Sequence, residues 1–285
     1  MNITIKGEER VKIVIKIGGS LFEEDLHFLY EDVAHLVNDE HHDIVIVHGG
    51  GPQIDLILKN QGKEPRFLFS QEGVKSRHTD EDTRDAAIMA LGGLVNKGIT
   101  AALIKHGVNA FGFTGVDGAI MTARRKDKIV SVDPATSKRM VVRNDFSGRI
   151  EPEKVKGDII IKLLEMGIVP VIGALAISED GAILNADGDR AAACVCKAIG
   201  GDAFISVTDV PGVLKDMESQ EVISTIPVGN LDAILESVSG GMKKKIIAVK
   251  EAVSFGIPRV IITSGLVEQG ISKALAGEAG SMITQ

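Results

Sequence analysis

The sequence lacks tryptophan altogether and has only two cysteines among its 285 residues. These cysteines, Cys194 and Cys196, lie two positions apart in a predicted helix, so their side chains point to different sides. We therefore expect buried thiols, with neither a disulfide between them nor a metal site. No run of about 18 apolar residues, as a membrane span needs, is present, and Glu8, Glu9 and Arg10 stand where a secretion signal would be apolar. These absences predict a soluble, cytoplasmic protein that does not contact membranes.

Familiar nucleotide-binding and catalytic signatures are missing as well. The chain has no Gly-x4-Gly-Lys-Ser/Thr loop and no Gly-x-Gly-x-x-Gly fingerprint. It also shows no serine–histidine or cysteine–histidine arrangement for nucleophilic catalysis. A net charge of -7 argues against a general nucleic-acid binder, while 44% apolar residues suffice for a large core in one or two domains.

Four short islands stand out instead: residues 16–20 (KIGGS), 48–52 (HGGGP), 185–187 (NAD) and 240–245 (GGMKKK). The first two glycine groups directly follow apolar runs that are typical of strands. Glycines at strand ends let bare backbone N–H groups approach an anion. Together with a lysine near each end of the chain, they indicate a site that holds phosphate.

The wider pattern alternates strands with helices and predicts an α/β fold with a parallel sheet. Strands are expected over 11–17, 44–47, 110–113, 168–172, 203–207 and 259–262, and helices over 26–37, 52–62, 80–106, 152–166, 187–199 and 242–255. A loop or hairpin is expected over 64–77. Residues 129–132 and 140–142 should pair as an antiparallel hairpin around a turn at 133–136. The best fit is two lobes that share one continuous sheet, divided near residue 175.

The charged residues of the islands can also have structural roles that involve no ligand. Lys16 lies inside an apolar strand, where it must face a polar site, be paired, or extend its ammonium out to water from the strand end. Asp187 and Asp189 could simply cap a helix. Lys243 and its two lysine neighbours open a helix, where cations oppose the dipole, so an anion is expected there.

In combination, the motifs resemble the amino-acid kinase family over nearly the whole chain. The resemblance is carried by 16–20, 48–52, 77–80 (RHTD), 94–97 (LVNK), 185–187, 208–213 (TDVPGV) and 240–245. It implies a three-layer αβα sandwich with a mainly parallel central sheet and two lobes. Residues 1–175 would bind the acceptor substrate and dimerise, and residues 176–285 would bind ATP, with Mg²⁺ accompanying the nucleotide rather than held in a metal site of the protein.

The resemblance also implies roles for particular residues. Phosphoryl transfer would use Lys16 and Lys245, oriented by Asp187. Backbone N–H groups would come from Gly18 and Gly19 on the nucleotide side and from Gly50 and Gly51 on the substrate side. The acceptor would be bound by Arg77 and Asn185, and the nucleotide by Thr208, Asp209, Gly212 and Lys243. Whether Lys243 or Lys245 is the main reactive lysine stays open.

Within the family, the order and lengths are similar to N-acetylglutamate kinase and to kinases that act on an amino acid attached to a small acidic carrier protein. Residues 65–80, 185–189 and 242–245 favour the carrier-dependent branch. A basic stretch containing Arg124, Arg125 and Lys128 suits an acidic carrier, although a solvated charge run would look the same. The substrate would be 2-aminoadipate, glutamate or both, in lysine or arginine biosynthesis.

The alternatives are N-acetylglutamate kinase itself and a non-catalytic amino-acid or nucleotide sensor on the same fold. A side-chain carboxylate is ionised at neutral pH, so the reaction needs no general base, and His48 and His78 are expected to be structural or to line the substrate. An acyl-phosphate reductase is a conceivable downstream partner. Because only about ten residues precede the first strand, we expect a homodimer insensitive to arginine, without the N-terminal helix that links dimers into hexamers in arginine-inhibited relatives.

Overall fold

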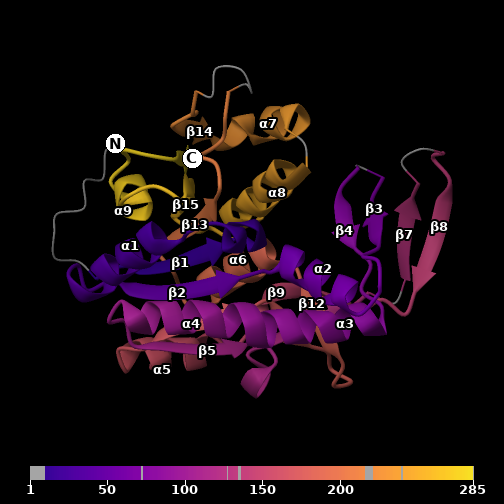
Figure 1. Ribbon diagram of the computed structural model, residues 1–285. Coiled ribbons are helices and arrows are strands. Elements are labelled where there is room, and N and C mark those ends of the chain that lie inside the picture. The colour runs from indigo at the N-terminus through magenta and orange to yellow at the C-terminus, as the bar shows by residue number, and fades with distance from the viewer. Residues whose placement is uncertain are drawn as a thin grey trace.

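The computed structural model describes residues 10–71, 73–126, 128–133, 136–215, 221–238 and 240–284. Its centre is an eight-stranded sheet in the order β14-β16-β15-β13-β1-β2-β10-β5 (Figure 1). The strands are β1 (Lys12–Ile17), β2 (Asp43–His48), β5 (Ala110–Thr114), β10 (Val169–Gly173), β13 (Ala203–Thr208), β14 (Thr225–Pro227), β15 (Arg259–Ser264) and β16 (Ser281–Thr284). Neighbours from β5 through to β15 are parallel, and β16 runs antiparallel to β15. The mainly parallel sheet is confirmed.

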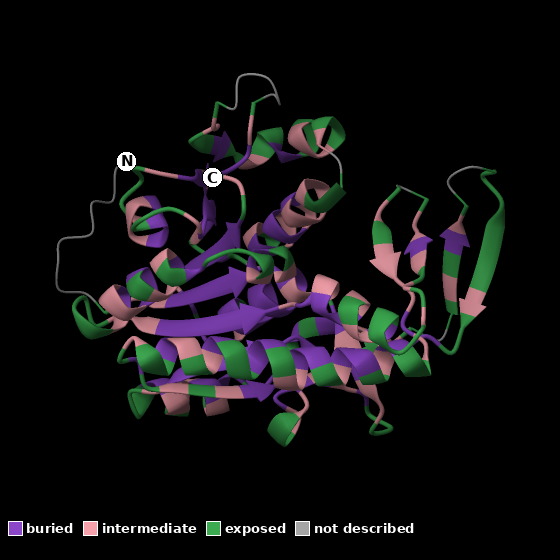
Figure 2. Ribbon diagram, viewed as in Figure 1, coloured by how far each residue is buried: buried purple, intermediate pink, exposed green. Residues whose placement is uncertain are grey.

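Helices cover both faces of this sheet. Ile13, Ile15 and Ile17 of β1 pack toward α1 (His27–Asn38), α4 (Val95–Lys105) and α9 (Gly270–Leu275), whereas Val14 packs toward the other side, on α5 (Gly157–Glu165), α6 (Gly188–Ala198) and α8 (Gly240–Ser254). Strands buried on both faces explain the unbroken apolar runs in the sequence. Figure 2 shows these strands as the buried centre of the molecule, so the three-layer prediction is confirmed.

A second group of strands contains one wrong prediction. Four strands, β6 (Met121–Arg125), β9 (Ser147–Val155), β11 (Leu175–Ile177) and β12 (Ile183–Ala186), pair in a closed ring. The helix expected over 152–166 is present as α5, but it begins only at Gly157, and Pro152 lies in the strand β9. Pro152, which resembles a first helical residue, lies in a stretch where the β6–β9 register shifts, and such an irregular stretch tolerates a residue without an N–H.

Two hairpins project from the body on the same side (Figure 1). One is β3 (Phe67–Phe69) with β4 (Lys75–Arg77), in the segment expected to be a loop or hairpin. The other is β7 (Lys128–Val132) with β8 (Arg139–Arg143), which confirms the antiparallel pairing predicted there. Pro134 and Ala135 of its expected turn lie outside the described residues. The Phe69 N–H donates to Ser131 Oγ at 3.1 Å and ties the two hairpins together.

The long helix predicted over 80–106 is present with an irregular centre. It consists of α3 (Glu81–Ala87), a π-helical stretch η2 (Ile88–Leu94) and α4, and Asp80 caps it by accepting the Thr83 N–H at 2.9 Å. By length and composition alone this helix could cross a membrane, with a mean hydropathy of 1.6. One face packs on the sheet. Its other face exposes apolar side chains. The remaining described α-helices are α2 (Gly51–Asn60) and α7 (Leu231–Ser237).

Candidate active site

The two glycine turns lie side by side at the carboxyl ends of β1 and β2. Ile17 at the end of β1 is in register with His48 at the end of β2. A Cβ added to Gly19 would lie 2.8 Å from the backbone nitrogen of Gly51 and 2.9 Å from the Cα of Gly50, so the two backbones touch and only glycine fits. The short helix η1 (Gly19–Glu23) and helix α2 begin at these turns. This edge is where open parallel sheets bind ligands.

Two lysine ammonium groups from opposite ends of the chain converge on the first turn. A Cβ added to Gly18 would lie 3.8 Å from Lys245 Nζ and 3.9 Å from Lys16 Nζ. Lys16 is buried on β1, and Lys245 lies in the second turn of α8. Burial and the neighbouring charge of Lys16 lower the pKa of Lys245, and the charges of three aspartates oppose this shift: Asp189, Asp209 and Asp187. Two cations held this close favour an anion between them.

The carboxylate that contacts Lys16 is Asp189, which differs from the predicted role of Asp187. Asp189 Oδ2 accepts from Lys16 Nζ at 2.8 Å, and its Oδ1 accepts from Ser206 Oγ at 3.3 Å. Burial alone would raise the pKa of Asp189, but the charges of Lys16 and Lys245, together with the hydrogen bonds from Lys16 and Ser206, lower it. The structure thus brings Lys16, Asp189 and Lys245 together in one charge cluster, in which Lys16 and Asp189 are buried and Lys245 is half-buried.

Asp187 caps a helix, which was the alternative role considered for both Asp187 and Asp189. Its Oδ1 accepts the backbone N–H of Arg190 at 3.0 Å at the N-cap of α6. The first turn of α6 then carries Asp189 toward β1, beside Gly188, where an added Cβ would lie 3.6 Å from Lys16 Cε. The sequence signal for this arrangement was the small Gly188 between the two acids. We therefore assign the orientation of Lys16 to Asp189, while Asp187 acts on Lys245 only as a nearby charge.

His48 supports the second glycine turn from below. Its Nδ1–H donates to the Gly49 carbonyl at 3.0 Å, which leaves Nε2 to accept from Asn96 Nδ2 at 3.1 Å. The Asn96 amide also donates to the carbonyls of Phe113 and Val171, so the LVNK motif joins β2, β5 and β10. Burial lowers the pKa of His48 to about 4, and the imidazole is neutral at pH 7. His48 is a structural residue here.

The residues predicted to bind the acceptor substrate lie beside the second glycine turn. Arg77, at the end of β4, forms an ion pair with Asp55 and donates from Nη2 to the Gly51 carbonyl at 3.1 Å. Its guanidinium is thereby held at the first turns of α2. Asn185 Nδ2 donates to Thr79 Oγ1 at 3.3 Å. The structure thus places Arg77 and Asn185 on segments joined through Thr79.

A buried aspartate, which sequence reasoning missed, anchors this acceptor segment to the base of the β7–β8 hairpin. Asp145 is fully buried; its Oδ2 accepts the Thr79 N–H at 2.9 Å and its Oδ1 accepts the Ser147 N–H at 2.7 Å. The Arg125 guanidinium stacks on Phe146 with Cζ 3.9 Å from the ring centroid, and its Nε–H donates to the Asp145 carbonyl at 3.0 Å. These contacts join the base of the β7–β8 hairpin to the segment of Thr79.

The predicted nucleotide residues surround the same edge from the C-terminal half. Thr208 ends β13 and donates to Asp209 Oδ1 at 2.8 Å. A Cβ added to Gly18 would lie 3.7 Å from the carbonyl of Val207, so this strand end adjoins the first glycine turn. A Cβ added to Gly212 would lie 2.7 Å from Ser281 Oγ, which only glycine avoids. Lys243 is half-buried in the opening turns of α8.

The basic residues predicted to bind a carrier separate into two groups. Arg124 and Lys128 are exposed, whereas Arg125 is half-buried and fixed against Phe146. The outer strand β8 adds exposed Arg139 and Arg143, which the sequence prediction did not include. Figure 2 shows β8 as mostly exposed. The cationic surface thus extends along the β7–β8 hairpin.

The two cysteines are buried and unpaired by disulfide, as expected. Burial raises the pKa of Cys194 and of Cys196 to about 12, which keeps both thiols protonated and unreactive. Among the described residues, no group of three or more His, Cys, Asp or Glu side chains could hold a metal ion.

The chain belongs to the amino acid kinase family, whose model matches residues 11–264. Among individual relatives, a LysW-aminoadipate/LysW-glutamate kinase of Saccharolobus islandicus is 34% identical over 264 residues, covering 92% of this chain and 96% of that protein. A protein of Nitrosopumilus maritimus (strain SCM1), named for the same activity, is 36% identical over 272 residues, covering 95% of this chain and 98% of its own length.

Solved structures share the fold at low identity. An N-acetylglutamate synthase from Neisseria gonorrhoeae has a TM-score of 0.76 at 22% identity, over 96% of this chain and 59% of that one. A Giardia carbamate kinase has a TM-score of 0.63 at 17% identity, over 97% of this chain and 99% of that one. These similarities establish the architecture alone.

The buried neutral state of His48 predicts a specific acid sensitivity. Because the folded pKa of about 4 lies below the unfolded value, the unfolded chain binds a proton that the folded protein does not as the pH falls from about 6.5 to 4. His48 should therefore remove roughly 3 kcal/mol of stability across that window. Urea unfolding of the wild type and of His48→Gln at pH 7, 5.5 and 4.5 measures this: the variant, weaker at pH 7, should lose less on acidification, and equal losses would contradict the assignment.

Proposed function

We propose that this chain is an ATP-dependent kinase that phosphorylates the side-chain carboxylate of 2-aminoadipate or glutamate attached to an acidic amino-group carrier protein. The product would be an acyl phosphate of lysine or arginine biosynthesis. The names of the relatives support this reading. The single observation that carries it is the convergence of Lys16 and Lys245 on Gly18, beside a second glycine turn.

The chemistry follows from charge and position. The attacking carboxylate, with a reference pKa of about 4.3, is ionised at neutral pH, so no side chain has to remove a proton. The transferring phosphoryl group carries negative charge on its equatorial oxygens. Lys16 and Lys245 neutralise that charge, and the N–H groups of Gly18, Gly19, Gly50 and Gly51 donate to the phosphoryl oxygens. Asp189 keeps Lys16 oriented toward the site instead of letting it swing away from Lys245.

The nucleotide lies along the C-terminal half, near Thr208, Asp209, Gly212 and Lys243. Mg²⁺ would enter with ATP, because Mg²⁺ is usually bound through substrate phosphates with one or two carboxylates, and Asp209 stands close enough to Lys245 to influence its pKa. When bound, the ion supplies charge neutralisation at the phosphates. In this proposal residues 1–175 form the acceptor lobe and residues 176–285 the ATP lobe, with Asn185 contributed to the acceptor by the second lobe.

The acceptor amino acid is bound by Arg77 and Asn185. The planar guanidinium of Arg77 offers two parallel donors to a carboxylate, and its ion pair with Asp55 fixes the plane. One methylene separates aminoadipate from glutamate and is worth only about 1 to 3 kcal/mol in a pocket. Both substrates therefore remain within the proposal.

The carrier protein docks on the β7–β8 hairpin. Lys128, Arg139 and Arg143 give this exposed surface a cationic character in a chain with a net charge of -7. Arg124 adds to it from β6, and Arg125 acts from the base by holding Phe146. An acidic carrier is attracted by this surface, and Asp145 connects its base to the acceptor segment.

The assembly in this proposal is a cytoplasmic homodimer. β5 is an edge strand with α4 packed beside it, and the two expose Phe111 (53%) and Ile104 (56%), while Leu94 (58%) is exposed at the end of η2, directly before α4. A groove of about 720 Å³ is lined in part by Leu56 and Leu94. A second copy covers this apolar surface and the free strand edge. A reductase that consumes the reactive acyl phosphate is a further proposed partner.

The catalytic assignment predicts unequal effects within the charge cluster. Lys16→Ala and Lys245→Ala should each lower kcat about 100-fold or more, as loss of a preorganised donor does. Asp189→Asn should lower kcat more than Asp187→Asn, because only Asp189 contacts Lys16. Lys244→Ala is the matched control. Steady-state kinetics on folded variants measures this; a loss below about threefold for either lysine would remove it from the mechanism.

The docking surface predicts a salt-dependent loss. Reversing Lys128, Arg139 and Arg143 to glutamate should raise KM for the carrier-borne substrate at least about tenfold, with little change in KM for ATP, because exposed charges mainly steer association. The difference in KM between the wild type and this variant should shrink above physiological ionic strength, because the screening length for exposed charges is then shorter than about 8 Å. Reversal of Lys105, Lys154 and Lys162, on helices and a strand of the body, is the control. Unchanged carrier kinetics would reduce the hairpin to a solvated surface.

The dimer surface makes a separate prediction. Phe111→Asp combined with Ile104→Asp should shift the protein to monomers, because two charges would have to be buried at the interface. Light scattering measures the molar mass, and Glu165→Lys, a surface charge change on α5, serves as the control. A wild type that is monomeric or hexameric would contradict the proposed assembly.

A further inference from the structure

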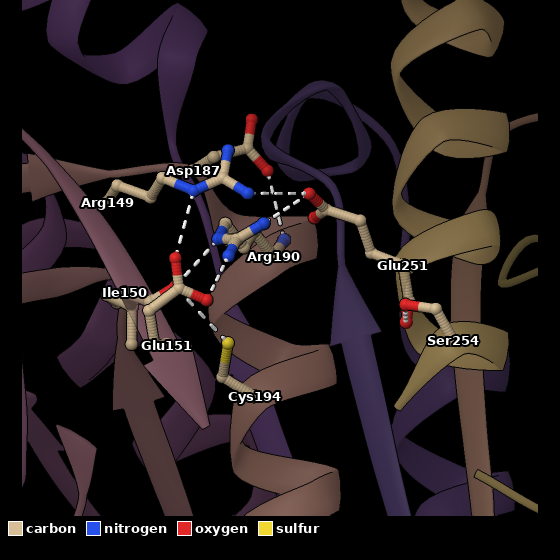
Figure 3. A network of polar contacts seen from close by, with 8 residues as sticks. All are labelled: Arg149, Ile150, Glu151, Asp187, Arg190, Cys194, Glu251 and Ser254. Carbon is tan, nitrogen blue, oxygen red and sulfur yellow. Dashed lines mark hydrogen bonds and ion pairs between the residues drawn. The ribbon is translucent and has the colours of Figure 1, made fainter. Parts of the chain in front are cut away.

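A buried guanidinium at the start of α6 connects three elements around the charge cluster. Arg190 donates from Nε to the Ile150 carbonyl at 2.7 Å, forms an ion pair from Nη2 to Glu151 Oε2 at 2.7 Å, and pairs through Nη1 with Glu251 (Figure 3). Its side chain is only 9% exposed. Arg149, beside it on β9, reaches the same two glutamates but is 56% exposed. The contacts of Arg190 join β9, α6 and α8.

The two helices joined by Arg190 carry the opposing charges of the active site. Asp189, the residue directly before Arg190, holds Lys16 on β1. Glu251 lies six residues after Lys245 on α8, a rise of about 9 Å along the helix. The pair of Arg190 with Glu251 therefore fixes where α8 stands along α6. That position in turn sets how far Lys245 lies from Asp189 and Lys16.

The end of helix α8 that carries Lys245 opens on two glycines. It begins at Gly240, with φ of 58°, and Gly241, and among the described residues no atom lies within 4 Å of a Cβ added at either glycine. Its buried residues are apolar, Ile246, Ala248, Val249 and Ala252, and apolar contacts are not directional. Repulsion between Lys16 and Lys245 opposes the docking of this end of the helix, whereas the charges of Asp189, Asp209 and Asp187 favour it. Lys250 forms an ion pair with Asp232 that joins α8 to α7, and the forked guanidinium of Arg190 supplies a directional contact that joins α8 to α6.

We propose that Arg190 is a positioning residue that holds α8 against α6 through Glu251 and so keeps Lys245 at the phosphoryl site. The role of Lys245 rests on the proposed function, whereas its placement beside Lys16 and Asp189 does not. The groups that face Lys245 are Lys16, Asp189, Asp209 and Asp187. Arg190 contacts β9 through Ile150 and Glu151, and it acts on Lys245 through Glu251 of α8.

Two variants and one control separate positioning from general stability. Arg190→Gln removes the fork, Glu251→Gln removes the same contact from the α8 side while Glu151 still binds Arg190, and Arg149→Gln removes the exposed arginine. We expect both test variants to lower kcat about tenfold, with KM for ATP and carrier-borne acceptor within about threefold of wild type. The double variant Arg190→Gln/Glu251→Gln should have a kcat no lower than that of Arg190→Gln, because both substitutions act on the same contact between Arg190 and Glu251. Arg190→Lys, which keeps charge without the fork, should be intermediate.

A readout without substrate tests the displacement itself. The rate at which an amine-acylating reagent labels Lys245, followed by mass spectrometry against pH, reports its titration. In the wild type the midpoint should lie below that of an ordinary lysine, because burial and Lys16 lower the pKa of Lys245. In Arg190→Gln and Glu251→Gln the labelling midpoint should rise toward that of an ordinary lysine. In Arg149→Gln the midpoint should equal that of the wild type.

The outcomes distinguish the two claims. Unchanged kcat and an unchanged labelling midpoint in folded Arg190→Gln and Glu251→Gln proteins would overturn the positioning role. If Arg190→Gln does not fold, Glu251→Gln, whose side chain is more exposed, decides the question alone. A wild type that transfers no phosphoryl group while the variants still shift the midpoint would overturn the proposed function and support the positioning of Lys245.

Discussion

The buried ion pair between Lys16 and Asp189 is the contact on which the rest of the site depends. It places a cation inside the apolar sheet, where an unpaired charge would be strongly unfavourable, and breaking such a pair by removing one partner typically costs about 3 to 5 kcal/mol. Asp189 lies on the first turn of α6, so the helix must dock on β1 for the pair to form. Lys245 then brings a second ammonium group beside Gly18, with the charges of Asp209 and Asp187 nearby. The convergence of two ammonium groups on one glycine turn is the reason to expect an anionic ligand.

Much of the fold and part of the site could be predicted from the sequence. The unbroken apolar runs of β1 and β2, with helical periodicity between them, suffice to predict a parallel sheet covered on both faces. The glycine turns after these runs locate the site, because carboxyl ends of parallel strands meet at one edge. The helix expected over 152–166 begins five residues later than predicted, at Gly157, because proline suits both a first helical turn and an irregular strand, and the pairing with β6 that favours the strand is not visible locally.

The finer assignments depend on contacts between distant segments. Asp187 and Asp189 are both compatible with capping and with holding a lysine, and only the docking of α6 on β1 decides that Asp189 reaches Lys16. Arg125 and Lys128 look alike in the sequence because both are basic. In the structure Arg125 stacks on Phe146, whereas Lys128 is exposed. Nothing in the sequence around Asp145 predicts its structural role. That role depends on the backbone N–H of Thr79, a residue distant in the sequence, which donates to the Asp145 carboxylate.

The central claim is phosphoryl transfer from ATP to a carboxylate on a carrier protein. Its most direct measurement incubates the enzyme with ATP, Mg²⁺ and LysW protein loaded with 2-aminoadipate or glutamate, traps the acyl phosphate with hydroxylamine, and determines the mass of the carrier. Free N-acetylglutamate is the parallel substrate. The account predicts a hydroxamate on at least one loaded carrier and much slower reaction with N-acetylglutamate. Efficient reaction with N-acetylglutamate and none with either carrier would contradict it.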